Sequence, residues 1–405
     1  MGGKNRLGVG ILAILVVASC RGGQELPISS PTSVRDSAGV RIVHNEAPDS
    51  TARLAWQVGG HPFLSIGESE GDLAYELFGV EDALRLDDGR VLVANGGTSE
   101  VRVFDRSGTH LANWGREGEG PGEFTGLTGV WRWPGDSVMA WDFAQSRFTV
   151  FDLIGEVGRA QRLTQGSGSG AGRVEGILGD GSLITSSLLS FGPGQRMSGL
   201  VRRSREFVRV AADGTRLNSL GEHQDEEYYV RAEVGAILRH PFRRSVHSVV
   251  WNGRIVISPS DRYEVRAYRP SGELDFIVRR DHALRAVTQA EVDALVAERL
   301  AAADPEARTT LEHVFAGLPP VESFPAFSEL IADDTGDLWV REYTVPGDER
   351  SVWTVFASDG EVRGLVELPA GFTVYRIGED YVLGKSTDDL DVERVQLWVL
   401  DRSNE

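Results

Sequence analysis

Few side chains in this chain have the types and spacing that catalysis requires. Its eight histidines are scattered, and none lies in the His-Glu-x-x-His pattern that places two imidazoles on a zinc ion. Cys20 is the one cysteine, which excludes thiolate metal sites and cysteine nucleophiles from the rest of the chain. Segment 166–170 has its serines out of phase for a nucleophile elbow, and segment 378–386 has one residue too many for a phosphate-binding loop. The sequence therefore holds no secure catalytic signature.

The first twenty residues indicate export and lipid attachment instead. Lys4 and Arg6 precede an apolar run over 7–17, which is too short to span a bilayer core of about 30 Å. Segment 17–20, Val-Ala-Ser-Cys, resembles a bacterial lipobox. The resemblance implies cleavage before Cys20 and acylation of its thiol and amino group. An ordinary secretory signal followed by a chance cysteine is the alternative.

These features divide the chain into three parts. We expect a signal peptide over 1–19, an acylated cysteine with a flexible tether over 20–39, and one folded domain over 40–405. Arg21 stands where an inner-membrane retention signal would have aspartate, so we expect anchoring at the outer membrane of a bacterial cell envelope, facing the periplasm or the surface.

Composition excludes one class of partner. The chain has 42 Lys plus Arg against 60 Asp plus Glu, a formal charge of −18, and no basic block interleaved with aromatic residues. Such a surface repels phosphate backbones, so no nucleic-acid partner is expected. Apolar residues make up 41% of the chain, which is enough for a large core and excludes wholesale disorder.

A repeated pair of strands is the strongest structural signal. Segment 101–111 has apolar residues at every second position, then a turn that closes on Gly108, then a second alternating run. The pattern returns at 148–155, 208–214, 265–272 and 353–360. Another pair of short strands precedes each of them, which gives four strands per unit. Repeated units of four strands are typical of β-propeller blades.

A sixth unit starts at Phe372 and ends near Asp401 without a fourth strand. Segment 54–58, Leu-Ala-Trp-Gln-Val, precedes the first unit and has no partner of its own, so we expect it to supply the missing outer strand and close the ring. A linear solenoid or two sandwiches would not explain a surplus strand at one end and a deficit at the other.

Segment 115–124, Gly-Arg-Glu-Gly-Glu-Gly-Pro-Gly-Glu-Phe, followed by a strand, a turn and Val-Phe-Asp, resembles an NHL repeat. Over residues 50–401 the chain resembles six-bladed propellers of the NHL and TolB-like kind, as found in bacterial lipoproteins, and the motif is clear between Phe78 and Leu163. The resemblance implies an all-β, six-bladed β-propeller whose N-terminal strand closes the last blade, with one short helical insertion. Such propellers serve as binding platforms and occasionally as enzymes.

Two insertions, at 188–205 and 221–245, carry the only dense group of arginines. Arg202, Arg203 and Arg243 are candidate contacts for an anionic ligand, because guanidinium groups suit carboxylates and phosphates. The alternative is that these arginines pair with the acidic residues of the same insertions, which are Glu222, Asp225, Glu226 and Glu227.

The third insertion, 288–315, is the convincing helical segment. Thr288 and Glu291 form a capping box, and Asp304-Pro305 begins a second short helix. We expect this insertion to pack on one face of the propeller between the fourth and fifth blades, either as a lid or docking surface or as structural padding.

Polar residues after the second strand of each blade are candidates for a site in the central channel. Alignment on the turns places Asn95, Asp142, Ser187, Pro259 and Glu342 at equivalent positions, and Glu81, Asp82 and Glu329 lie near the starts of innermost strands. Oxygen ligands of this kind suit Ca²⁺, and six-bladed lactonases and gluconolactonases resemble such an arrangement. Pro259 interrupts the ring, and turn capping or hydrogen bonding is the alternative role for these side chains.

The sequence therefore predicts a membrane-anchored, monomeric binding module for a protein, peptide or glycan, with no required cofactor. The alternatives are a Ca²⁺-dependent hydrolase or lyase that uses the channel, and a structural subunit of an assembly. Catalysis is the less favoured of these expectations.

Overall fold

The computed structural model describes residues 2, 32–49, 52–68, 70–163, 172–189, 198–233, 235–345 and 350–403. The predicted signal peptide and the acylated Cys20 lie outside these residues. Among the residues described, no helix is both long and apolar enough to cross a bilayer.

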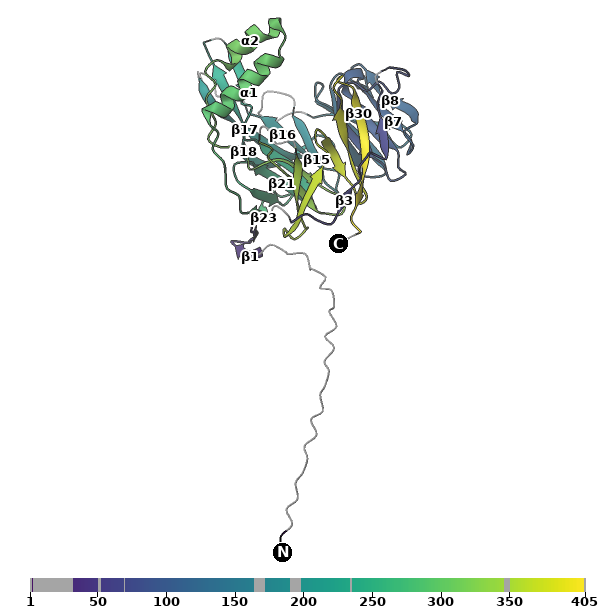
Figure 1. The fold of residues 1–405 in the computed structure, drawn as a ribbon. Helices are drawn as coiled ribbons and strands as arrows, with labels where there is room; N and C mark the ends of the chain where they lie inside the picture. Colours follow the sequence, from purple (N-terminus) through teal and green to yellow (C-terminus); the bar gives the residue numbers. More distant parts are fainter. Residues whose placement is uncertain are drawn as a thin grey trace.

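Six antiparallel sheets form the blades, and the innermost strands of neighbouring blades contact each other all the way around a ring (Figure 1). Blades 1 and 2 consist of β5 (Val80–Arg85), β6 (Val91–Asn95), β7 (Glu100–Phe104), β8 (His110–Trp114), β11 (Leu127–Trp133), β12 (Ser137–Asp142), β13 (Arg147–Asp152) and β14 (Val157–Arg162). The short β9 (Arg116–Glu117) and β10 (Glu123–Phe124) pair between these two blades.

Blades 3 and 4 carry extra strands. Blade 3 consists of β15 (Arg173–Ile177), β16 (Leu183–Leu188), β17 (Gly199–Val210), β18 (Arg216–Arg231) and β19 (Ala236–Arg239). Blade 4 consists of β20 (Val246–Trp251), β21 (Arg254–Pro259), β22 (Glu264–Tyr268) and β23 (Leu274–Arg280), extended by β2 (Val40–Asn45) and β1 (Thr32–Ser37).

Blades 5 and 6 complete the ring. They consist of β24 (Phe327–Ala332), β25 (Leu338–Glu342), β26 (Ser351–Phe356), β27 (Val362–Leu368), β28 (Thr373–Ile377), β29 (Tyr381–Thr387) and β30 (Glu393–Asp401). The P-loop-like segment begins in the turn before β29 and continues into this strand. Gly384 of β29 allows β28 to approach, since an added Cβ would come 2.2 Å from the carbonyl oxygen of Thr373.

The alternating apolar residues of the strands form one buried cluster between each pair of neighbouring blades. The bulkiest fully buried side chains of these clusters are Trp141, Trp251, Trp339 and Trp353. Because the cluster between blades 6 and 1 joins strands from the two ends of the chain, burial of apolar surface itself holds the ring closed.

The N-terminal segment closes the last blade, as the sequence predicts. β3 (Gln57–Val58) pairs with β30, placing Val58 opposite Leu400, and Trp56 packs into the core between blades 5 and 6. β4 (Leu64–Ile66) also pairs with β30, which was not predicted. Gly-Gly-His-Pro at 59–62 lies between β3 and β4, and because glycine and proline are typical of a strand end, the sequence pattern does not predict a second strand after them.

The prediction of a flexible tether over 20–39 is wrong for its last eight residues. β1 and β2 form a hairpin around Ala38 and Gly39, which both have positive φ, and β2 joins β23 as a parallel outer strand. Ile42 and Val43 of β2 are buried against blade 4. The low apolar content of β1 hid the hairpin, because β1 itself is almost fully exposed.

The helical insertion lies between β23 and β24, with α1 (Gln289–Ala302) and α2 (Pro305–Phe315). Both predicted caps are present: Thr288 and Glu291 form a capping box, and the Asp304 side chain accepts hydrogen bonds from two backbone N–H groups of α2. The helices pack mainly on the extended part of blade 3, since Val292 and Phe315 share a cluster with Tyr229 and Leu238. The sequence predicts packing between the fourth and fifth blades; Phe324 and Tyr343 beside blade 5 do join this cluster, but the main contact, with blade 3, was not predicted.

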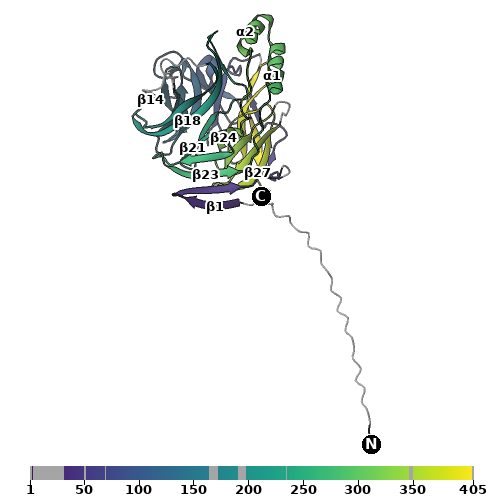
Figure 2. The same ribbon diagram turned by 90° about the vertical axis from the view of Figure 1, so that its left-hand side faces the viewer.

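The extended ends of β17 and β18, with β19, project from the same face as α1 and α2, and we call this the insert face (Figures 1 and 2). β1 lies at the opposite end of the molecule from the two helices (Figures 1 and 2). The starts of the innermost strands and the ends of the second strands also lie at the insert face, because each blade is antiparallel.

Candidate functional site

The mouth of the central channel at the insert face is the candidate site. Asn95, Asp142, Pro259 and Glu342 each lie opposite the first residue of their innermost strand, so the predicted equivalence of these positions is confirmed in the register. Ser187 lies one residue beyond the last paired residue of its strand with β15. The sixth member, missed in the sequence, is Lys385 opposite Thr373.

The side chains of Asn95 and Asp142 stabilise loops by hydrogen bonding to loop residues of their own blades. The Asn95 Oδ1 atom accepts from the Phe78 N–H at 2.8 Å, and its Nδ2 donates to Thr98. The Asp142 carboxylate accepts from the Thr125 N–H at 2.7 Å and from the Gln145 N–H at 2.8 Å. Both side chains are fully buried. These contacts match the turn-capping alternative to metal ligation.

Glu342 is partly exposed and forms an ion pair with the buried Arg280. Its Oε1 accepts from Arg280 Nη1 at 2.8 Å, from the Tyr263 hydroxyl at 2.7 Å and from the Thr354 hydroxyl at 2.6 Å. Burial and the Glu342 charge raise the pKa of Tyr263 well above its usual value, so its hydroxyl stays protonated and remains a donor. The carboxylate of Glu342 is therefore already saturated by this chain's own donors.

The acids at the starts of the innermost strands differ in their surroundings. Glu81 is exposed, whereas Asp82 is buried and accepts from Arg376 Nη2 at 2.9 Å and from the Val130 N–H at 3.1 Å. Burial raises the pKa of Asp82 although Arg376 opposes the shift. Burial likewise raises the pKa of Glu329, whose carboxylate lies 3.4 Å from Arg341.

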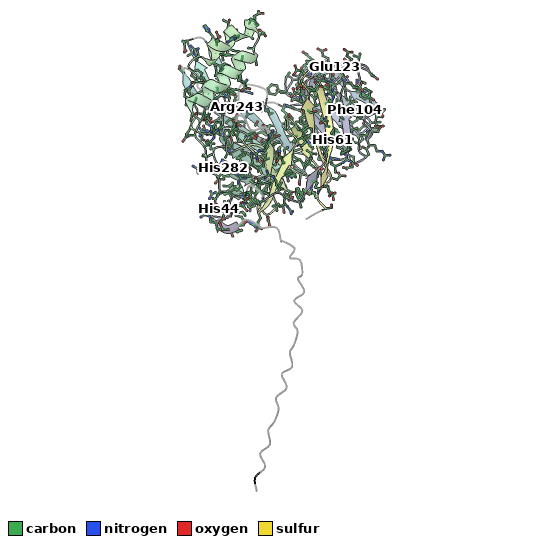
Figure 3. The ribbon with its side chains drawn as sticks, in the orientation of Figure 1. His44, His61, Phe104, Glu123, Arg243 and His282 are labelled. Carbon is green, nitrogen blue, oxygen red and sulfur yellow. The ribbon has the colours of Figure 1, made fainter. Side chains whose placement is uncertain are left out.

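The structure does not bring the predicted oxygens together as a metal site. Across the described residues, no group of three or more His, Cys, Asp or Glu side chains is placed to hold a metal ion. Two cations, Arg376 and Lys385, occupy the sixth blade's part of the channel, and Lys385 pairs with Glu393. In Figure 3, His61 lies apart from His44 and His282, and His44 pairs with Asp281, the residue next to His282.

Sequence reasoning missed Glu175 of β15, which joins blades 3 and 4. Its carboxylate accepts from the Ser248 hydroxyl at 2.7 Å and from the Ser186 hydroxyl. A β-bulge places Glu175, and similar bulges interrupt the innermost strands of blades 1, 2, 5 and 6. Bulges re-aim side chains. They fall at the second residue of the innermost strand in blades 1, 2 and 5 and at the third in blades 3 and 6.

The arginines of the two insertions pair with acidic side chains, some within the insertions, as in the alternative, and one, Asp261, outside them. Arg202 Nη2 donates to Asp261 at 2.8 Å, Arg205 pairs with Asp225, and Arg244 pairs with Glu227. Arg203 donates to the Leu189 carbonyl oxygen at 2.7 Å. The insertions form β17 to β19 rather than loops, which brings opposite charges into cross-strand contact.

Arg243 lies beside the channel mouth below the helices (Figure 3). Arg243 and Arg239 both approach Glu226, at 3.2 and 3.1 Å, and the Tyr228 hydroxyl donates to the same carboxylate at 2.8 Å. Although burial opposes ionisation, these donors hold the pKa of Glu226 below its usual value. Burial and the Arg243 charge lower the pKa of the adjacent His247 to about 4, so this imidazole is neutral at physiological pH.

Apolar side chains are also exposed around this face. They lie in the loops before β5 and after β12 and β23, in the loop between β29 and β30, and on the projecting β17 and β19. These residues are Leu73, Phe78, Phe143, Leu200, Ile237, Leu284 and Leu390.

Comparisons with known proteins support the fold. A family model described as DUF5128, a 6-bladed beta-propeller, matches residues 76–165. A member of the DUF4221 family from Bacteroides vulgatus has a TM-score of 0.50 at 8% identity, covering 85% of this chain and 98% of that chain. A Bacteroides fragilis protein described as exported has a TM-score of 0.49 at 13% identity, covering 88% and 99% of the two chains.

The virginiamycin B lyase of Staphylococcus aureus has a TM-score of 0.41 at 11% identity, with 85% of this chain and 99% of that chain covered. No protein with a curated description matches the sequence. The family match spans the first two blades, and six interblade cores close the ring; the chain is therefore a six-bladed β-propeller.

Proposed function

We propose that this protein is a lipid-anchored binding module of the bacterial cell envelope that captures a protein or peptide through its insert face. The observation that carries the proposal is that seven of the fourteen exposed large apolar side chains among the described residues lie on that face, from Leu73 and Phe78 on one side to Ile237 and Leu284 on the other. Most of these side chains are aliphatic, which favours a protein ligand over a glycan stacked on aromatic rings.

Occupied polar groups support binding over catalysis. The carboxylates of Asp142 and Glu342 accept hydrogen bonds from the chain's own donors, and the carboxylate of Asp82 accepts one from Arg376. An acid or base for catalysis needs access to the substrate within hydrogen-bonding distance. The neutral His247 is partly buried and contacts Ser245 at 3.2 Å. The polar side chains that line the channel are thus hydrogen-bonded to one another and to the backbone, and are not arranged to contact a substrate.

The orientation of the anchor fits this function. The first strand described, β1, begins at Thr32, at the end opposite the helices and twelve residues after Cys20. An extended segment of that length reaches about 40 Å. If Cys20 is acylated, the attachment enters the domain at the end opposite the helices, which leaves the insert face free for partners in the periplasm or outside the cell.

Photocrosslinking in cells tests the proposal. A benzoylphenylalanine placed at Ile237 or Leu284 should yield crosslinks to the same partner, because both positions lie on the insert face. Ile154, which is 79% exposed in the outer turn of blade 2, is the matched control. Equal crosslinking from Ile154, or capture of glycan alone, contradicts the proposal.

A lipid-labelling arm tests the anchor separately. The wild-type chain should incorporate radiolabelled palmitate and sediment with membranes, whereas Cys20→Ser should do neither. A wild-type chain that stays unlabelled removes the anchor from the proposal but leaves the binding face testable in a soluble form.

A further inference from the structure

We propose that the insert face carries a preformed groove between blades 6 and 1 that docks a basic peptide segment bearing an apolar side chain. This inference rests on the proposed binding function and gives its partner a chemistry. The groove has a volume of about 570 Å³ and includes Leu73, Glu76, Phe78, Glu100, Asp391 and Val392 in its lining. It lies on the side of the face away from α1 and α2, near β7 and β30 (Figure 1).

Arg102 fixes one wall of the groove. Its Nη1 donates to the carbonyl oxygens of Leu73 at 2.8 Å, Ala74 at 3.1 Å and Glu76 at 2.8 Å, and its Nε pairs with Glu100 at 2.9 Å. Arg102 is itself buried. These hydrogen bonds fix the loop before β5 to β7 of blade 1, so the groove is formed without a ligand. A preformed site binds with a smaller ordering cost.

The groove presents apolar side chains to solvent. Phe78 is 70% exposed, Leu73 is 72% exposed, and Leu390 beside Asp391 is 81% exposed. The backbone N–H of Phe78 is held by Asn95, and its ring rests against Gly97, where an added Cβ would come 2.1 Å from a ring atom. The ring is therefore positioned by Gly97 and Asn95 yet left uncovered, as an anchor for an apolar partner residue would be.

The charge of the groove selects the partner. Glu68, Glu76, Glu100 and Asp391 line it, and Arg102 is the one cation among the described lining residues, already bound to Glu100 and three carbonyl oxygens. The lining therefore carries an unbalanced negative charge beside apolar surface. Lysine or arginine side chains flanking an apolar residue complement both properties, whereas an acidic peptide would be repelled.

Fluorescence polarisation of the full chain in detergent tests the groove. The probe is a fluorescein-labelled hexapeptide, Lys-Leu-Lys-Phe-Lys-Leu, with its charge-reversed counterpart, Glu-Leu-Glu-Phe-Glu-Leu, as the comparison. We expect saturable binding of the basic peptide that weakens with added salt. Phe78→Ser and Glu76→Lys should each weaken it about fivefold or more.

Two matched substitutions control for general effects. Ile154→Ser removes an equally exposed apolar side chain, and Glu273→Lys reverses an exposed charge in a turn of blade 4, so neither should change binding. Circular dichroism confirms that each variant is folded. No saturation by the basic peptide at about 1 mM, equal binding of the acidic peptide, or indifference to both groove substitutions overturns the inference. Crosslinking from Ile237 and Leu284 that persists in that case leaves the proposed function standing, because those positions lie outside the groove.

Discussion

The guanidinium carbon of Arg280 lies 3.6 Å from the ring centroid of Tyr263, and both side chains meet at the carboxylate of Glu342. The contact joins β23 of blade 4 to β25 of blade 5 near the channel mouth. A position that the sequence presents as a candidate metal ligand therefore serves to bind neighbouring blades together.

Glu342→Ala should destabilise the protein strongly. The substitution leaves the buried Arg280 without its carboxylate, and breaking such a pair costs about 3–5 kcal/mol. Urea unfolding followed by tryptophan fluorescence measures the change. Glu361→Ala, which removes an exposed glutamate in blade 5, should stay within about 0.5 kcal/mol of wild type. Similar stabilities for the two variants would contradict the assigned role.

Asp142→Ala should destabilise the chain by about 1–3 kcal/mol, because the backbone N–H groups of Thr125 and Gln145 lose their acceptor. The loss should be the same in calcium as in a chelator. Thermal unfolding in both buffers checks this independence, and wild-type stability should also be unchanged by calcium. A calcium-dependent rise in wild-type stability that disappears in Asp142→Ala would restore the metal hypothesis.

Arg402→Ala should weaken ring closure. Arg402 donates to the fully buried Asp333 carboxylate at 2.8 Å, and its guanidinium carbon lies 4.5 Å from the ring centroid of Trp56. Loss of this charged hydrogen bond should lower stability by about 1.5–3 kcal/mol. Arg402→Lys should recover only part of it, since lysine cannot reproduce the planar contact. Scanning calorimetry compares the three proteins; full recovery by lysine would show that charge alone suffices.

His247 should make the protein sensitive to mild acid. Its pKa is lowered to about 4, so between pH 6.5 and 4 the unfolded chain binds a proton that the folded chain does not. Its contribution is complete above pH 6.5 and declines as the pH falls, by up to about 2 kcal/mol at pH 5.

His247→Gln should therefore lose less stability than wild type between pH 8 and pH 5. Urea unfolding of both proteins at pH 8 and pH 5 measures the four free energies of unfolding that this comparison requires. Part of the acid sensitivity should remain, because burial also lowers the pKa of His223, His240 and His282. Identical pH dependence in the two proteins would show that His247 is not the titrating group.

The fold was largely predictable because its signals are local and repeated. Alternating strands, Asp-Gly turns and the helix caps at Thr288 and Asp304 are each set by neighbours in the chain. Closure by the segment around Trp56 followed from counting strands. The β1–β2 hairpin was missed because only its inner strand is buried, and that burial depends on β23, more than two hundred residues away.

The candidate site was only partly predictable. Register alignment correctly equated Asn95, Asp142 and Glu342, since the position of each is fixed within its own blade. Their partners come from other elements, such as Arg280 for Glu342, and no spacing in the sequence encodes them. The same limit applies to the groove, where Arg102 acts on a loop before its own blade.

The attachment of β2 to blade 4 has a mechanical consequence. A pull transmitted through Thr32 reaches β1 first, then β2 and β23, while β3 and β4 remain seated on β30. Asn45 at the end of β2 also bonds to the Gly360 carbonyl oxygen and the Val362 N–H of blade 5, so the load is shared by two blades. A pull on the N-terminal end is therefore borne by the hairpin and blades 4 and 5 before it reaches β3 and β4, where the two ends of the chain meet.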